Sequence, residues 1–229
     1  MDNIFEQYNI RLDEKKKLLF NNYYNFLIEK NKVMNLTSIT EKEEAYLKHF
    51  VDSLLPLSKI ENGSTVLDVG TGAGFPGLPL KIANDSLNVT LLDSLNKRIN
   101  FLNETIDLLK LNGVKAVHGR AEDYVNVSRE TFDVVVSRAV ARLNTLLEYC
   151  LPYVKIGGYF IAYKSLNCEE EIKECKKALN ILGGEIDFEK TFTADLAGNE
   201  RTLLFIKKIK KTPEKYPRGQ NKPKVSPIV

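Results

Sequence analysis

From Val66 to Gly77 the chain reads VLDVGTGAGFPG. An apolar run with one acid leads into four glycines within eight positions, and a helical pattern follows from Pro76. Because proline is favoured at the first position of a helix, the stretch predicts a strand, a tight turn and a helix. The spacing Gly72-x-Gly74-x-x-Gly77 fits dinucleotide-binding turns, in which a ligand lies against bare backbone. A glycine-rich turn that merely joins a strand to a helix has the same pattern, so the neighbouring residues must decide.

Strands and helices are predicted to alternate after this turn. Strand patterns cover residues 88–93, 114–118, 132–137 and 158–164, with helical patterns between or after them. Such alternation predicts a parallel sheet covered on both faces. Two more strands, at 185–192 and 201–209, are joined by a short polar loop that holds Gly198 and Asn199, which indicates an antiparallel pair. The expected fold is therefore α/β, with a mostly parallel seven-stranded sheet.

Two further helices are predicted before the glycine-rich turn. Apolar residues recur at helical spacing over 11–30 and again over 41–57, so both helices should cover one side of the core. We expect three parts: an N-terminal helical extension at 1–60, the α/β domain at 61–209 and a basic C-terminal tail at 210–229.

The composition is that of an ordinary soluble protein. The 229 residues are 43% hydrophobic and 28% charged. No apolar run approaches the roughly 18 residues of a membrane span, and the N-terminus lacks the apolar segment of a signal peptide, which favours the cytoplasm and no membrane partner. Cys150, Cys168 and Cys175 are odd in number and lack Cys-x-x-Cys spacing, so we expect buried thiols and neither disulfides nor a metal site.

The net charge of +3 conceals an asymmetry. From Phe205 onward eight Lys or Arg residues face a single Glu, which gives +7, while the rest of the chain carries −4. A basic segment of this kind indicates a polyanionic partner, since each phosphate contact releases counterions. A solubilising tail is the alternative. We expect the segment from Lys207 to be partly disordered.

Polar residues stand at the ends of four predicted strands, where open α/β sheets bind ligands. They are Asp68 with the glycine-rich turn, Asp93, the Ala121-Glu122-Asp123 stretch and Ser137-Arg138. A carboxylate that ends the second strand can accept both hydroxyls of a ribose, which is the role expected of Asp93. A helix cap or a surface turn is the alternative for Asp93 and for Glu122.

His49, Asp52 and Ser53 share one face of the second predicted helix, opposite its apolar stripe. They could line a pocket. A solvated polar face is the alternative, and periodicity alone favours it.

A nicotinamide cofactor and S-adenosylmethionine both suit a glycine-rich turn followed by a ribose-binding acid. Asp68 favours the second, because a carboxylate beside the turn opposes a pyrophosphate but tolerates a sulfonium cation and an amino group.

A set of short motifs is spread over nearly the whole chain. They are Asn35–Thr37, His49–Leu54, the Gly-Phe-Pro-Gly end of the turn, Leu91–Ser94 with Lys97-Arg98, Arg120–Glu122, Val136–Ala139, Tyr163-Lys164, Glu200-Arg201 and Tyr216–Arg218. In this combination, which is specific, the chain resembles the RsmG or GidB family, small-subunit rRNA guanine-N7 methyltransferases. This resemblance implies a class I, Rossmann-like methyltransferase that uses S-adenosylmethionine to methylate N7 of one guanine in the decoding-region loop of 16S rRNA.

The resemblance also implies roles for single residues. Gly70 and Phe75, with the turn glycines Gly72 and Gly74, correspond to the loop at the methionine part of the cofactor. Ala121 and Glu122 correspond to adenine contacts, Asp93 to the ribose ligand, and Arg138 to a pocket residue that orients the cofactor or the guanine. His49, Asp52 and Ser53 correspond to the rim of the active site.

Guanine N7 carries an unprotonated in-plane lone pair, so its methylation needs positioning and no general base. Three alternatives stay open: a methyltransferase for another RNA, a dehydrogenase, and a non-catalytic RNA-binding module. We expect a monomer that acts on 16S rRNA or the small ribosomal subunit. Arg201 could simply be a sheet-edge residue.

Overall fold

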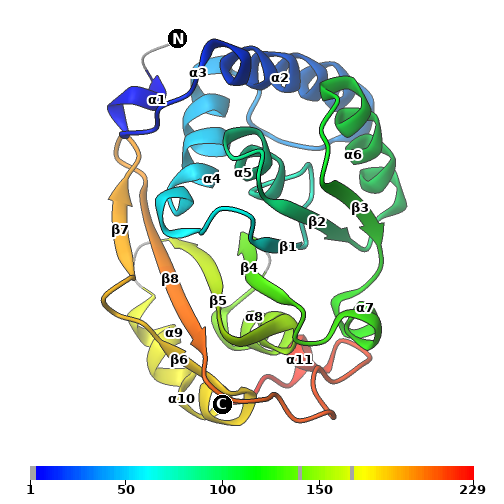
Figure 1. Ribbon diagram of the computed structural model, residues 1–229. Coiled ribbons are helices and arrows are strands. Elements are labelled where there is room, and N and C mark those ends of the chain that lie inside the picture. Colours follow the sequence, from blue (N-terminus) through cyan, green and yellow to red (C-terminus); the bar gives the residue numbers. More distant parts are fainter. Residues whose placement is uncertain (1–3, 139–140, 166–167) are drawn as a thin grey trace.

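The structure, a computed structural model, describes residues 4–138, 141–165 and 168–229. Ala139, the last residue of the Val136–Ala139 motif, lies outside them. The described residues form one eight-stranded sheet in the order β3-β2-β1-β4-β5-β8-β6, and β7 also pairs with β8 (Figure 1). The strands are β1 Thr65–Val69, β2 Asn88–Asp93, β3 Val114–His118, β4 Phe132–Arg138, β5 Val154–Ser165, β6 Gly184–Ile186, β7 Phe192–Asp195 and β8 Glu200–Lys208.

The pairing confirms a mostly parallel sheet. The neighbouring strands β3, β2, β1, β4 and β5 pair in parallel, and β8 runs antiparallel to β5, β6 and β7. The predicted count of seven strands was wrong, because the stretch 185–192 is not one strand. The Asp187 carboxylate accepts hydrogen bonds from the Lys190 N–H and the Tyr159 hydroxyl. This closes a turn that separates β6 from β7 along the same edge of β8.

Helices cover both faces of the sheet (Figure 1). Because successive side chains of a strand point to opposite faces, Val134 and Val136 join the core under α2, α5 and α6, while Val135 joins the core under α7, α8 and α10. The α-helices are α1 Ile4–Gln7, α2 Glu14–Met34, α3 Lys42–Ala45, α4 Asp52–Leu54, α5 Gly77–Ala83, α6 Asn96–Leu109, α7 Ala121–Ser128, α8 Leu143–Cys150, α9 Glu169–Glu174, α10 Lys176–Leu182 and α11 Lys222–Val225.

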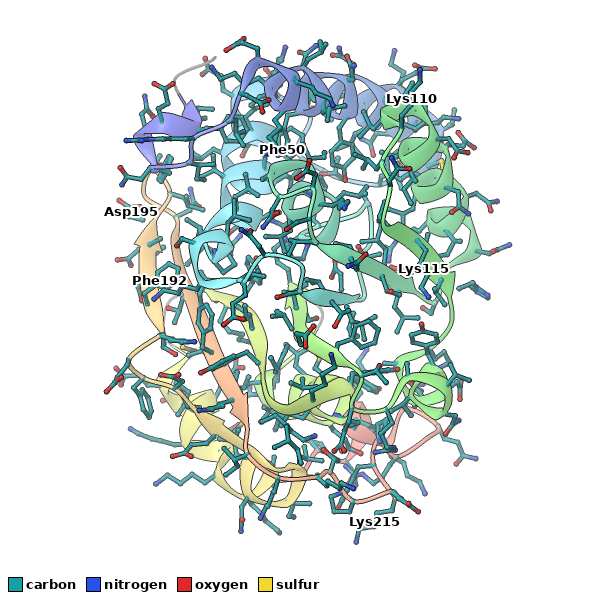
Figure 2. All side chains as sticks on the ribbon, in the orientation of Figure 1. Phe50, Lys110, Lys115, Phe192, Asp195 and Lys215 are labelled. Carbon is teal, nitrogen blue, oxygen red and sulfur yellow. The ribbon has the colours of Figure 1, made fainter. Side chains whose placement is uncertain are left out.

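The N-terminal extension packs onto the first of these faces, as predicted. Phe20, Tyr23 and Leu27 of α2 are fully buried, and the Phe50 ring packs at a tilt against the rings of Phe20 and Tyr23 (Figure 2). Phe50 belongs to a π-helical segment, Tyr46–Val51, that joins α3 to α4. The extension and the sheet thus share one hydrophobic cluster. The division at residues 60 and 209 stays a prediction.

The basic tail is folded against the body, so the expectation of partial disorder was wrong. Tyr216 and Ile228 are each only 8% exposed, and they anchor the segment in the core under α8. The Arg218 guanidinium binds the fully buried Glu148 carboxylate through two hydrogen bonds of 2.8 and 2.7 Å. Charge count alone misses these anchors. Among the described residues, no helix combines the length and apolar composition that crossing a bilayer requires.

Candidate functional site

The turn between β1 and α5 contains glycines with positive backbone φ angles. Gly70 and Gly72 have φ of 72° and 62°, which side chains rarely tolerate. The Gly70 and Thr71 N–H groups donate to the Leu92 carbonyl of β2 at 2.9 and 3.1 Å. The turn therefore lies across the carboxyl ends of β1 and β2 with its backbone exposed on one side.

Gly74 and Gly77 serve packing. A Cβ on Gly77 would lie 2.4 Å from Leu91 Cδ2, so this glycine lets α5 touch the sheet. A Cβ on Gly74 would lie 2.5 Å from Leu78 Cδ1. Gly74, a predicted cofactor contact, does not line the cavity beside the turn.

A cavity of about 430 Å³ opens beside the turn. It brings together six of the predicted site residues, namely Gly70, Gly72, Phe75, Asp93, Arg138 and His49. The rest of its wall consists of Leu36, Thr37, Thr71, Ala73, Ser94 and Arg98. The cavity is therefore built jointly by the carboxyl ends of the strands and by the N-terminal extension.

Asp93 contributes a carboxylate to the cavity wall, and the residue is only 3% exposed. Its Oδ2 accepts hydrogen bonds from the Gly72 N–H at 2.9 Å and from Arg98 Nη1 at 3.1 Å. Its Oδ1 accepts from the Leu95 N–H at 2.9 Å. Asp93 thus holds the turn that precedes α6 and also faces the cavity.

Asp52 is fully buried between two arginines, which excludes a solvated face. Its Oδ2 accepts from Arg138 Nη1 at 2.8 Å, and its Oδ1 accepts from Arg201 Nε at 3.2 Å. Arg138 Nη1 also reaches the carbonyls of Lys48 and His49 at 3.2 and 3.3 Å. The helix periodicity could not show this, because Arg138 and Arg201 arrive from strands far along the chain.

Ser53 is likewise fully buried. Its hydroxyl donates to the His49 carbonyl, and its own carbonyl accepts from the Tyr163 hydroxyl at 2.8 Å. Ser53 therefore fixes the helix that carries His49 and does not line the cavity.

His49 and Arg138 both contact the Phe75 ring. The imidazole stacks on the ring at 4.5 Å and 15°, and the guanidinium carbon lies 5.0 Å from its centroid. His49 Nε2 is 2.8 Å from the Thr37 hydroxyl. Burial, reinforced by the Arg138 charge, lowers the pKa of His49 to about 3. At neutral pH the imidazole is uncharged, so His49 acts in the wall through stacking and hydrogen bonding.

Comparison with known proteins identifies the family. The model of GidB, rRNA small subunit methyltransferase G, matches residues 16–203. The chain belongs to the GidB family. It is 56% identical over 214 residues to ribosomal RNA small subunit methyltransferase G of Lachnoclostridium phytofermentans. The matched stretch covers 92% of this chain and 88% of that protein. The protein of the same name from Staphylococcus aureus is 47% identical over 227 residues, covering 98% and 95%.

Solved structures of lower identity share the GidB chain's fold. A SAM-dependent methyltransferase from Aquifex aeolicus superposes with a TM-score of 0.53 at 21% identity, covering 71% of this chain and 92% of its own. TYW2 from M. jannaschii, solved in complex with AdoMet, gives a TM-score of 0.56 at 18% identity, covering 70% and 76%. The class I, Rossmann-like fold expected from the sequence is confirmed.

In this GidB chain, Asp68 holds the glycine-rich turn through hydrogen bonds. It is fully buried, and its Oδ2 accepts from the Thr71 hydroxyl at 2.7 Å and from the Gly77 N–H at 2.8 Å. Its Oδ1 is buried and finds no hydrogen-bond partner among the described residues. Asp68, which the sequence places among the cofactor contacts, does not line the cavity. Burial raises the pKa of this carboxyl to about 7, although both hydrogen bonds oppose the rise.

The raised pKa of Asp68 predicts a pH-dependent stability. Between about pH 4 and pH 7 the unfolded chain has lost this proton while the folded chain keeps it, so stability falls by up to about 1.4 kcal/mol per pH unit as pH rises. Asp68→Asn keeps one acceptor oxygen but cannot titrate, so the wild type should lose stability relative to this variant across that window. Urea unfolding of both proteins at several pH values measures the difference. A difference that does not change with pH would contradict the account.

Ala121 and Glu122, the predicted adenine contacts, begin α7 and do not line the cavity. Glu122 accepts from Arg120 Nε at 2.9 Å, and Arg120 also donates to Asn221 of the C-terminal segment. Their role in cofactor binding stays a prediction.

The sequence patterns predicted no role in the cavity for Thr37 and Arg98, and they were compatible with Arg201 as a sheet-edge residue. All three belong to the motifs of the family resemblance, which was the signal that could have found them. Cys150, Cys168 and Cys175 are buried, as expected, and their thiols are free. No group of three or more His, Cys, Asp or Glu side chains in the described part of the chain is placed to hold a metal ion.

Proposed function

We propose that this protein transfers a methyl group from S-adenosylmethionine to N7 of a guanine in 16S rRNA. The observation that carries the proposal is the cavity in which the bare backbone of Gly70 and Gly72 meets the Asp93 carboxylate. Membership in a family whose members are named for rRNA methylation supplies the substrate.

The cavity fits the cofactor. Its volume of about 430 Å³ lies within the usual range of ligand sites. Each carboxylate oxygen offers two acceptor positions, and Asp93 Oδ1 uses one of them, which leaves capacity for a ribose hydroxyl. When bound, S-adenosylmethionine supplies a methyl group on a positively charged sulfur.

The chain's own residues then provide positioning. Phe75, held by stacking on His49 and by the Arg138 guanidinium, forms a fixed wall beside the turn. Asp52 and two backbone carbonyls fix Arg138 in turn. Because guanine N7 has a free in-plane lone pair, alignment is the main demand on the site. With a pKa of about 3, His49 is a weak proton acceptor, and Asp52 is engaged by two arginines, which agrees with a reaction that needs no general base.

The function is tested by incubating the purified protein and methyl-labelled S-adenosylmethionine with 16S rRNA, small subunits, 23S rRNA and transfer RNA. We expect label in 16S rRNA, and chemical cleavage at 7-methylguanine should locate it at one guanine. Label in 23S rRNA or transfer RNA alone would favour the other-RNA alternative. RNA binding without label would favour a non-catalytic module, and tight binding of reduced nicotinamide cofactor would favour a dehydrogenase.

Asp93→Asn is expected to weaken S-adenosylmethionine binding about tenfold, because a neutral amide replaces a charged acceptor. Equilibrium dialysis measures the change. Asp107→Asn, an exposed position on α6, is the matched control and should bind normally. Equal affinity of both variants would remove Asp93 from the proposed ribose site.

We propose that the exposed lysines of the C-terminal segment add RNA affinity. They are fewer than the eight Lys and Arg residues that the sequence holds from Phe205 onward. Lys208 is fully buried, and its ammonium donates to the Leu151 carbonyl, while Arg218 is engaged by Glu148. Lys215 lies at the outer margin of the molecule (Figure 2). The exposed members of the segment are Lys207, Lys210, Lys211, Lys215, Lys222 and Lys224.

A monomeric state and a cytoplasmic location stay predictions, and light scattering of the purified protein tests the first.

A further inference from the structure

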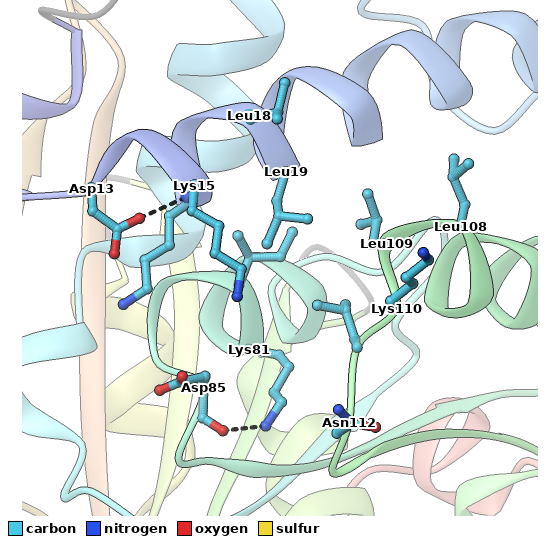
Figure 3. A pocket seen from close by; sticks show the side chains of 13 residues that line it. Asp13, Lys15, Leu18, Leu19, Lys81, Asp85, Leu108, Leu109, Lys110 and Asn112 are labelled. Carbon is cyan, nitrogen blue, oxygen red and sulfur yellow. Dashed lines mark hydrogen bonds between the residues drawn. The ribbon is translucent and has the colours of Figure 1, made fainter.

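A second and larger cavity, of about 790 Å³, lies between α2, α5 and α6 (Figure 3). Its lining includes Leu18 and Leu19 near the start of α2, whereas Leu36 and Thr37 of the first cavity follow the end of that helix. The Asn31 side chain accepts from the N–H groups of Leu36 and Thr37, so these two residues lie beside Asn31, which is 12 residues, or about 18 Å, from Leu19 along α2. The second cavity is therefore separate from the proposed cofactor site.

Its walls are aliphatic. Leu18, Leu19, Leu108 and Leu109 line it from α2 and α6, and Ile82 lines it from α5. Leu18 and Leu108 are 59% and 51% exposed, which is unusual for leucines that line the same hollow. The residues that the structure describes in this lining include no aromatic ring on which a nucleobase could stack, so the surface is suited to an aliphatic body and not to RNA bases.

Its polar lining is predominantly cationic, with four lysines against Asp13 and Asp85. Lys81 is 4% exposed, and its ammonium donates to the backbone carbonyls of Asp85 and Leu87 at 2.5 and 2.6 Å. Among the described residues no carboxylate lies within ion-pair distance of this ammonium, so the buried positive charge is stabilised by the two carbonyls and by the more distant charge of Asp85. An ammonium has three donors, and two are used.

Lys15 and Lys110 are exposed on the rim, and within the described residues no hydrogen bond or ion pair engages either ammonium. Lys16 is different, because its ammonium donates to the Ala83 carbonyl at the end of α5. Asp13 is also engaged locally, since its carboxylate accepts from the Lys16 N–H. The net charge of the lining is thus positive. Lys81 lies at the buried floor of the cavity, and Lys15 and Lys110 lie at its exposed rim.

We propose that this cavity is a binding site for a small amphipathic anion, with an aliphatic body against the leucines and a carboxylate or phosphate head group at Lys81, Lys15 and Lys110. The site goes beyond the methyltransferase function and does not depend on it.

The test is calorimetric titration of the full-length protein with octanoate and with octyl phosphate. Octanol serves as the uncharged probe and inorganic phosphate as the head group alone. We expect both amphipathic anions to bind more tightly than either control, and their relative affinities distinguish a carboxylate from a phosphate ligand. Equal binding of octanol would overturn the anionic part of the proposal. Competition by saturating S-adenosylmethionine would place the probe in the first cavity and would overturn the separate site.

Variants locate the binding. Lys81→Met removes the floor charge at similar length and should weaken binding about tenfold. Because Lys81 is buried and its variant could fail to fold, the exposed pair Lys15→Gln/Lys110→Gln and the exposed Leu108→Gln provide independent tests with the same expected direction. Lys176→Gln/Lys177→Gln on α10, also exposed, is the matched control and should leave affinity unchanged. Unchanged affinity in the rim pair and in Leu108→Gln would refute the site.

Discussion

Arg138→Ala is expected to lower the free energy of unfolding by about 3 kcal/mol, at the lower end for a broken buried ion pair, because Arg201 still contacts Asp52. The side chain of Arg138 is 10% exposed and that of Asp52 is fully buried. Removing the guanidinium leaves one carboxylate oxygen and two backbone carbonyls without their donor.

The same variant should slow methylation about 100-fold, since the wall formed by Phe75 loses its support and misplacement by about 1 Å has effects of this size. Labelled methyl transfer under saturating cofactor, below the melting temperature of the variant, measures the effect. Arg138→Lys keeps the charge but not the planar fork, so it should recover only part of the rate.

Arg142→Ala is the matched control for Arg138→Ala. Arg142 also pairs with a carboxylate, that of Glu174, but its side chain is 61% exposed, and such surface pairs contribute only about 0–1 kcal/mol. If Arg138→Ala kept full methylation and full cofactor affinity, the role assigned to Arg138 would be wrong.

Arg218→Ala is expected to lower the free energy of unfolding by about 2 kcal/mol, between the values for exposed and buried pairs. The Arg218 side chain is 28% exposed, while its partner Glu148 is fully buried and would lose a bidentate cation. Urea unfolding measures the loss. The affinity for S-adenosylmethionine should not change, because neither residue lines the cavity.

Lys215→Ala is the control for Arg218→Ala and separates anchoring from RNA binding. It should leave stability unchanged and reduce the salt dependence of RNA binding by about one charge if Lys215 contacts a phosphate. Should Arg218→Ala instead keep full stability and weaken only RNA binding, the packed position of the tail would be refuted.

The sequence predicted the sheet well because its signals are local. The apolar runs that became β1, β2 and β4 are buried on both faces, and the glycine positions demand backbone angles that few other residues accept. Asp93 could be placed at the cavity because the carboxyl ends of parallel strands share one edge. The stretch 185–192 was misjudged because a turn closed by the Asp187 side chain looks like a continuing strand.

The predictions that failed depended on partners distant in the chain. Asp52 shares a helix face with polar residues, and only the sheet brings Arg138 and Arg201 to it. Tail composition indicated a partly disordered segment, yet burial of Tyr216 and the pairing of Arg218 with Glu148 fold it onto α8. Composition counts charges but does not show which of them find a buried partner.

The most direct measurement of the central claim is a crystal structure of the protein with S-adenosylhomocysteine. The account predicts the ligand beside the backbone of Gly70 and Gly72, with its ribose hydroxyls at the Asp93 carboxylate and Phe75 along its amino-acid end. A ligand bound outside this cavity, or a ribose with no contact to Asp93, would contradict the account.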